Sequence, residues 1–126
     1  MQHNNHNVGY YTGEDGWKVG MAPTINHTRI VGIPGSASSP LVNITQSTIQ
    51  SSACPYQYRQ ASTPGFTDGS SGGPWFWHFN TNTKLGNLLG DIGGCEEGGP
   101  KSGSPSYAPV WRYDFAQLVA TARSHE

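Results

Sequence analysis

Gly69-Ser70-Ser71-Gly72-Gly73-Pro74-Trp75 is the stretch of sequence that decides the fold. It places three glycines, two serines and a proline ahead of the apolar segment Trp75-Phe76-Trp77, whose aromatic residues favour a strand. Because glycines tolerate positive φ and the close approach of another backbone, the segment predicts a tight turn that leads into a strand. A serine on such a turn can display its hydroxyl to a substrate while nearby amides hold a developing oxyanion.

Composition bounds the class of protein. The chain has 126 residues, which suits one domain, and a net charge of −1 gives no electrostatic case for binding nucleic acid or an anionic membrane. No apolar run approaches the roughly 20 residues of a membrane span. Residues 1–7 lack the apolar region of a signal peptide and predict a disordered polar tail, followed by one domain over residues 8–126.

Short strands are expected along most of the chain, with turns about every 8 to 12 residues, and this spacing is typical of an antiparallel barrel or sandwich. Near the C-terminus, Phe115, Leu118 and Val119 are spaced three and four apart, which predicts a helix over 114–123. The expected strands are 8–11, 17–21, 28–33, 41–50, 54–58, 75–79, 84–92 and 106–111.

The glycine-serine segment resembles the nucleophile loop of the trypsin/chymotrypsin-like serine proteases, which reads Gly-Asp-Ser-Gly-Gly-Pro. Residues 69–74 match five of its six positions, and the Pro-Trp that ends the segment is most similar to secreted microbial members. The resemblance implies that Ser71 is the nucleophile and that the N–H groups of Gly69 and Ser71 form the oxyanion hole. Ser70 replaces the family's aspartate, so the ion pair that many members form there with a freed N-terminal amine is not expected.

The same resemblance implies an all-β fold. The chain would be the C-terminal half of a two-barrel protease: a six-stranded antiparallel Greek-key barrel of the trypsin-like type with a C-terminal helix. It would be a serine-type endopeptidase that hydrolyses peptide bonds through an acyl-enzyme, with protein or peptide substrates and without a cofactor or metal.

A substrate site is implied around the serine. In the resembled family the pocket floor lies near Gly65 and Phe66, and no aspartate stands there, so an apolar or small side chain is expected rather than Lys or Arg. Asp68 is too close to the serine to act as the selector of basic side chains. The segment Asp91-Ile92-Gly93-Gly94 resembles the edge strand that pairs with the substrate backbone.

A serine hydroxyl needs a base to take its proton. The resembled family uses a histidine oriented by an aspartate, and both come from its N-terminal barrel. None of the five histidines lies in a segment similar to the family's histidine motif; they are His3, His6, His27, His78 and His125. We therefore expect the histidine and aspartate to come from a missing N-terminal barrel, and the activity of this chain by itself is left open.

Cys54 and Cys95 fit one disulfide. Closing a loop of about 40 residues would stabilise the fold by roughly 4 kcal/mol in the chain-entropy model. Two buried free thiols are the alternative. In the resembled family, a disulfide-bonded cysteine at about the distance of Cys95 from Ser71 closes the pocket wall, and the resemblance implies a secreted, extracellular protein.

Two other functions remain open. One is a protease-like fold without activity that acts as a binding module. The other is a secreted β-domain with an aromatic platform for sugars, built from the four tryptophans, although aromatics at strand positions are more often core. A phosphate loop over residues 94–102 is dismissed, because Pro100 interrupts the required Gly-Lys-Ser/Thr pattern.

Overall fold

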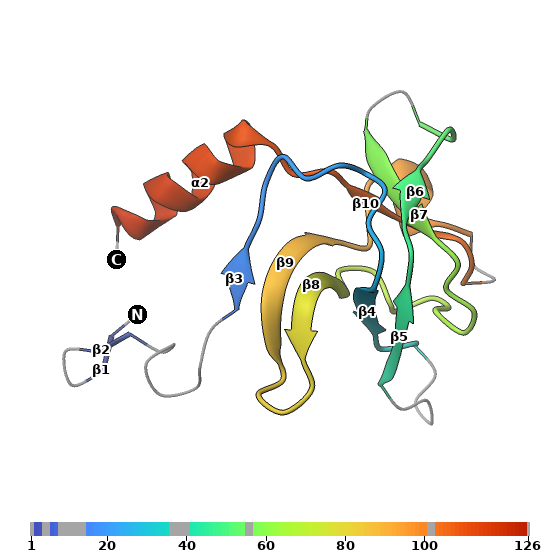
Figure 1. Cartoon of the computed structure of the whole chain (residues 1–126), viewed down its shortest axis with the longest axis horizontal. Helices are drawn as coiled ribbons and strands as arrows, with labels where there is room; N and C mark the ends of the chain where they lie inside the picture. The colour runs from blue at the N-terminus through green and yellow to red at the C-terminus, as the bar shows by residue number, and fades with distance from the viewer. Residues whose placement is uncertain are drawn as a thin grey trace.

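The chain folds into two β-sheets, a small two-stranded ladder and one C-terminal helix (Figure 1). The computed structural model describes residues 2–3, 6–7, 15–35, 41–54, 57–100 and 103–125. The elements are β1 (Gln2–His3), β2 (His6–Asn7), β3 (Gly16–Trp17), β4 (Thr28–Gly32), β5 (Val42–Gln46), β6 (Ile49–Gln50), β7 (Tyr58–Ala61), β8 (Pro74–Asn80), β9 (Leu85–Asp91), the 3-10 helix η1 (Cys95–Gly98), β10 (Ser106–Pro109) and α2 (Tyr113–Arg123).

The larger sheet has the strand order β3-β9-β8-β4-β5. All its neighbouring strands are antiparallel except β3, which runs parallel to β9. β4 forms because its side chains alternate between the two faces: Ile30 is fully buried, whereas Arg29 and Val31 lie on the opposite, half-buried face. This alternation gives the sheet one face toward the core and one toward solvent.

The smaller sheet has the order β10-β7-β6 and is antiparallel. Two residues separate β5 from β6, so the chain passes directly from the larger sheet into the smaller one. One of them, Thr48, is buried, and its hydroxyl accepts a hydrogen bond from the Ile25 amide at 3.1 Å. A second link between the two sheets is the hydrogen bond that the Gly93 amide, just after β9, donates to the Tyr107 carbonyl of β10 at 3.0 Å. The strand pairings of the described residues do not close into a barrel.

The core lies between the two sheets and draws on both. It is a cluster of buried apolar side chains with half-buried Val42 and Ile44 packed against it. Trp75 and Ile30 are both 0% exposed, so the strand that follows the serine loop is anchored at its second residue. The buried members are Ile30, Ala61, Phe66, Trp75, Ile92 and Ala108.

Arg59 of β7 is also buried, at 1% exposure. Its guanidinium donates to the carbonyls of Leu89, Met21 and Ala22 at 3.2, 3.0 and 3.4 Å. No carboxylate is among these partners, and burial lowers the pKa of Arg59 to about 10. The side chain therefore ties the segment before β4 to the β9 backbone, at the cost of burying a charge.

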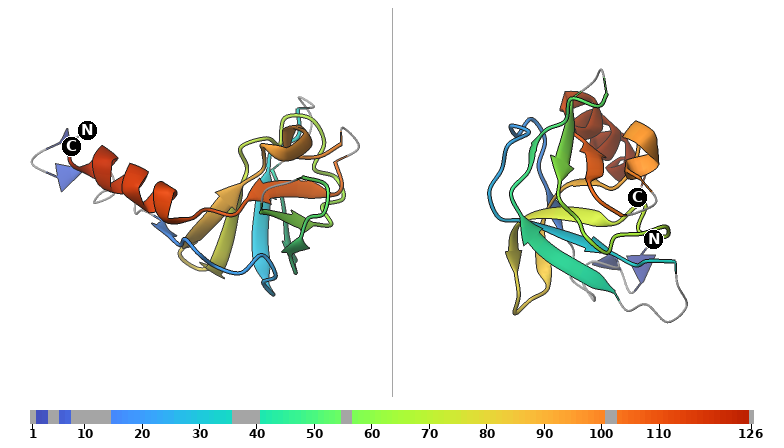
Figure 2. Two further views of the ribbon diagram at one scale, coloured as in Figure 1. Left: turned by 90° about the horizontal axis from the view of Figure 1, so that it is seen from above. Right: turned by 90° about the vertical axis from the view of Figure 1, so that its right-hand side faces the viewer.

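The helix α2 extends away from the sheets (Figure 2). None of its residues is buried, and an aromatic group at its start holds it to the sheets. Phe115 stacks on Trp111 with ring centroids 3.8 Å apart and meets Trp17 edge-on at 5.9 Å.

Most predicted elements lie where the sequence indicates. The expected strand at 54–58 is confirmed only at Tyr58, where β7 starts; Cys54 and Gln57 lie outside any strand, and residues 55–56 lie outside the described residues. The expected strand at 17–21 shortens to Trp17, since the following residues leave the sheet. Residues 8–11 lie outside the described residues. β1 pairs with β2 in antiparallel register, and the disorder expected for residues 1–7 stays a prediction.

Candidate functional site: the Ser71 loop

Backbone hydrogen bonds hold the serine loop in place. The Ser70 amide donates to the Thr67 carbonyl at 3.2 Å, and the Gly73 amide donates to the Ser70 carbonyl at 3.0 Å. The Gly35 amide donates to the Asp68 carbonyl, which fixes the loop to the chain just beyond β4. A Cβ on Gly73 would collide with the Val31 carbonyl, so only glycine allows the loop to lie this close to β4.

The two serines of the loop differ in burial. Ser71 is exposed, whereas Ser70 is 3% exposed. The glycines that flank them have positive φ, 101° at Gly69 and 83° at Gly72, which glycine adopts without strain. The Ser70 hydroxyl has no hydrogen-bond partner among the described residues, and its Cβ lies in the space that a side chain on Gly32 would need. The loop therefore presents one hydroxyl to solvent and buries the other.

The amides of the loop divide into two sets. Those of Ser70, Gly72 and Gly73 donate to backbone carbonyls. Those of Gly69 and Ser71, which the sequence assigns to the oxyanion hole, donate to no acceptor within the described part of the chain. These two N–H groups, which flank the buried Ser70 in sequence, are therefore not used by the hydrogen bonds that hold the loop.

The predicted substrate-binding segment lies directly beside the loop. The Gly72 amide donates to the Ile92 carbonyl at 2.8 Å, and the Ile92 amide donates to the Gly73 carbonyl at 2.9 Å. Asp91 ends β9 opposite Pro74, and the Gly93 amide is engaged by Tyr107 of β10. Gly94 follows with a φ of 76°. Residues 91–94 therefore connect the loop to the smaller sheet.

A small cavity of about 30 Å³ opens beside Ser71. Phe66 lies in its lining and is 4% exposed, whereas Gly65 is exposed and lies outside the lining. Room of this size holds about one or two water molecules, or a comparably small side chain. The other lining residues include Asp68, Ile92, Glu97, Gly98 and Ser106.

The predicted Cys54–Cys95 disulfide is confirmed. It joins the segment before β7 to the first residue of η1, whose later residues Glu97 and Gly98 form one wall of the cavity. Glu96 and Glu97 have positive φ values of 47° and 58°, which non-glycine residues adopt rarely. The bridge therefore restrains a locally strained wall.

No histidine stands next to Ser71 among the described residues, and the carboxylates that line its cavity are those of Asp68 and Glu97. The Ser71 hydroxyl makes no hydrogen bond to a described group, and no histidine lines the cavity. His27 and His78 are exposed and line a different groove, and His125 is exposed beyond α2. Within the same part of the chain, no three His, Cys, Asp or Glu side chains come close enough to hold a metal ion.

The sequence did not identify two residues of the cavity wall. Ser106 of β10 lines the cavity, and its hydroxyl lies 2.6 Å from that of Thr63, which in turn donates to the Gly103 carbonyl at 2.8 Å. Glu97 comes from η1. No local sequence signal marks Glu97 or Ser106. Ser106 reaches the cavity through the pairing of β10 with β7, and Glu97 reaches it through the disulfide at the start of η1.

The tryptophans do not form an open platform. Trp75 is fully buried. His78 stacks on Trp77 with centroids 3.5 Å apart, and the Lys18 ammonium lies 5.6 Å from the centre of the same ring. Trp111 is stacked on the helix. Since a sugar needs an open aromatic face, these contacts weigh against a carbohydrate platform.

No family model matches the chain, and neither a curated protein nor a solved structure is significantly similar to it. Among the described residues, no helix is long and apolar enough to cross a membrane.

Proposed function

We propose that Ser71 is the nucleophile of a serine-type endopeptidase of the trypsin-like class. The observation that carries the proposal is an exposed hydroxyl flanked by two unengaged amides, those of Gly69 and Ser71. Removing one such donor from an oxyanion hole typically costs about 3–4 kcal/mol of transition-state stabilisation. Amides fixed in place before reaction are effective because they need no rearrangement as charge develops.

The reaction follows from this arrangement. The Ser71 Oγ attacks the peptide carbonyl and forms a C–O bond while a base takes its proton, and the carbonyl oxygen becomes an oxyanion that accepts hydrogen bonds from the two amides. Collapse breaks the C–N bond, and the amine leaves with the proton from the base. Water then attacks the acyl-enzyme by the same route and releases the acid.

The base is proposed to be a histidine oriented by an aspartate, both supplied by an N-terminal barrel that packs beside this one. The chain itself would be the C-terminal Greek-key barrel. Two features support that arrangement. The chain passes directly from β5 into β6 of the smaller sheet, and the Gly93 amide, just after β9, donates to the Tyr107 carbonyl of β10.

The cavity beside Ser71 favours a small side chain next to the cleaved bond. Its volume is about 30 Å³, and buried Phe66 is part of its lining. Gly65 and Phe66 carry no charge, whereas Asp68 and Glu97 of the same cavity do, so the proposed preference depends on the cavity's volume. Residues 91–94 are proposed to pair with the substrate backbone, although the Ile92 and Gly93 amides already donate to Gly73 and Tyr107. The disulfide is typical of an oxidising compartment, so secretion is proposed.

The test is labelling with a fluorophosphonate, with imidazole added to replace the base. We expect slow labelling of the parent chain that imidazole accelerates, and the same behaviour in Ser70→Ala, whose hydroxyl is buried. Ser71→Ala should not be labelled. Labelling of Ser71→Ala at the parent's rate would remove Ser71 from the mechanism.

A catalytically inactive protease-like binding module is the second candidate. It is favoured by one observation: no histidine lines the Ser71 cavity among the described residues. The same experiment separates the two candidates, because an inactive module should show no imidazole-dependent labelling at Ser71.

A further inference from the structure

The outer face of the larger sheet carries a hollow that the proposed hydrolase does not use. Its volume is about 420 Å³, which lies within the roughly 300–1,000 Å³ of small-molecule pockets. The side chains that line it come from β4, β8 and the start of β5, and most of them are apolar. We call it the sheet-face hollow, and its apolar lining is Val31, Leu41, Pro74, Phe76 and Phe79.

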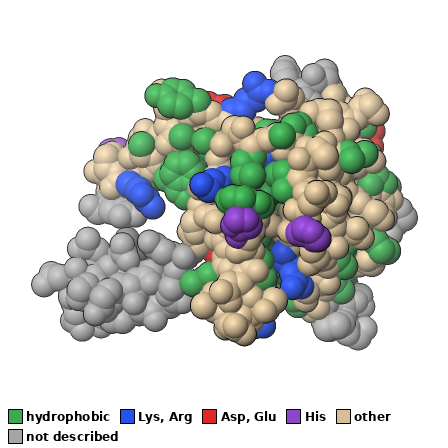
Figure 3. Space-filling model, viewed as in Figure 1, with side chains coloured by type: hydrophobic (Ala, Val, Ile, Leu, Met, Phe, Trp, Pro, Cys, Tyr) green, Lys and Arg blue, Asp and Glu red, His purple; other side chains and the backbone are tan. Residues whose placement is uncertain are grey.

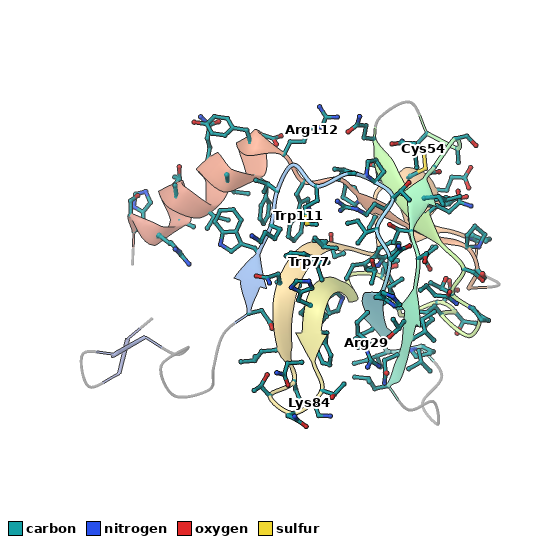
Figure 4. All side chains as sticks on the ribbon, viewed as in Figure 1. Arg29, Cys54, Trp77, Lys84, Trp111 and Arg112 are labelled. Atoms are coloured by element: carbon teal, nitrogen blue, oxygen red, sulfur yellow. A yellow bond between two sulfur atoms is a disulfide. The ribbon has the colours of Figure 1, made fainter. Side chains whose placement is uncertain are left out.

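Two cations border the sheet-face hollow. Arg29 belongs to β4, and Lys84 lies at the β8–β9 turn (Figure 4). Arg29 donates to the Asn43 side chain and lies 5.2 Å from the centre of the Phe79 ring, and both of these partners are neutral. Neither Asp nor Glu is among the described residues that line the hollow, and few acidic side chains reach the surface on the face drawn in Figure 3.

We propose that the sheet-face hollow binds a small amphipathic carboxylate. Its alkyl or aryl chain, about eight carbons long for a pocket of this size, lies on the apolar lining, and its carboxylate faces Arg29 and Lys84. Both parts of the ligand follow from the lining. The apolar side chains favour an alkyl or aryl group that shields them from water. The two cations have no carboxylate partner among the described residues, so they favour an anionic group.

The test is a titration of the ¹⁵N-labelled full chain with octanoate, followed by amide chemical shifts. We expect saturable shifts at Val31, Asn43 and Lys84. Arg29→Gln and Lys84→Gln should each weaken binding about threefold, the usual effect of an exposed ion pair, and the double variant about tenfold. Raising the salt concentration to 0.5 M should weaken binding in the parent chain but not in the double variant.

Matched controls isolate the two parts of the site. Arg112→Gln removes an exposed cation at the start of α2, far from Arg29 and Lys84, and should leave octanoate binding unchanged (Figure 4). Leu41→Ser alters a side chain that is 54% exposed, so it should weaken binding without unfolding the chain. Octyltrimethylammonium, which has the same chain length and the opposite charge, should not shift these amides.

Four outcomes would overturn the proposal. Octyltrimethylammonium could bind as well as octanoate, or the double variant could bind octanoate with unchanged affinity. Concentration-dependent dimers that protect these amides would assign the surface to a second copy of the chain. A Leu/Asp-alternating peptide that binds here when octanoate does not would assign it to a polypeptide.

Discussion

The Ser71 loop and the sheet-face hollow lie on different parts of the same fold and are built in different ways. Backbone hydrogen bonds hold the loop: Gly72 and Gly73 both pair with Ile92, and Gly35 pairs with Asp68. The hollow lies on the paired strands β4, β5 and β8, and its two cations have no described carboxylate partner. The loop therefore offers backbone amides, whereas the hollow offers an apolar lining and two cations.

This difference has a chemical consequence. Stabilising an oxyanion requires donors that do not move as charge develops, which a loop fixed by its backbone provides. Holding an apolar chain requires only sufficient buried area and a charge at the correct end. Each of the following variants should affect one region much more than the other.

The largest expected effect is on the wall of the Ser71 cavity. The double substitution Cys54→Ser/Cys95→Ser should lower the free energy of unfolding by about 4 kcal/mol, because a bridge over a separation of 41 residues is lost. Urea denaturation measures this change. Amide shifts should move at Glu97 and Gly98 and hardly at Val31 and Asn43. An unchanged urea midpoint would mean that the bridge does not support the wall.

Gly73→Ala should destabilise the chain by about 3 kcal/mol, because its Cβ meets backbone that cannot move aside. Gly72→Ala is the matched control, because Gly72 precedes Gly73 in the same loop but a Cβ added to it would face open space. Only its φ of 83° is unfavourable, at a cost of about 1 kcal/mol. Thermal unfolding of the two variants compares them. Equal losses would show that the close approach to Val31 does not matter.

Arg59 lines neither region and predicts a pH effect on the stability of the whole fold. Its folded pKa of about 10 is below the ordinary value of arginine, so below pH 10 the chain bears the full cost of burying the charge. As pH rises above 10, the folded state releases its proton before the unfolded state does, and stability increases. Between pH 9 and 11 the parent should gain roughly 1 kcal/mol relative to Arg59→Met, measured by urea unfolding at each pH. A parent that loses stability relative to this variant would contradict the sign.

The smallest expected effect on stability is at the sheet-face hollow. Leu41→Ser should change the free energy of unfolding by less than about 0.5 kcal/mol, because Leu41 is half exposed. Circular dichroism during heating tests this. A loss above 2 kcal/mol would mean that the hollow belongs to the core rather than to a ligand site.

The sequence predicted β4, β8 and β9, with β8 located from the aromatic residues that follow the glycine-serine turn, and it predicted α2 from its three- and four-residue spacing. Of these strands only β4 alternates in burial, because Trp75 and Phe76 of β8 are both buried. β7 was misplaced because its inward positions hold Arg59 and Ala61, so a buried arginine conceals the pattern. A short strand with a charged residue on its inner face cannot be recognised from hydrophobic period alone.

The sequence predicted only part of the candidate site, because some of its residues are brought together by tertiary structure. The glycine and serine motif located Ser71, and the two cysteines were correctly paired. Glu97 and Ser106 were not anticipated, since strand pairing and the disulfide bring them to the cavity from distant sequence. The inward direction of Ser70 also depends on tertiary structure, because it follows from the space that Gly32 leaves open.

The most direct test of the central claim is the ¹H–¹⁵N spectrum of the chain with acetyl-alanyl-boroalanine, whose boron forms a tetrahedral, negatively charged adduct with a reactive serine hydroxyl. We predict an adduct at Ser71 and large downfield proton shifts for the amides of Gly69 and Ser71, with much smaller shifts for Ser70, Gly72 and Gly73. The absence of an adduct at Ser71, or equal shifts across all five amides, would contradict the account.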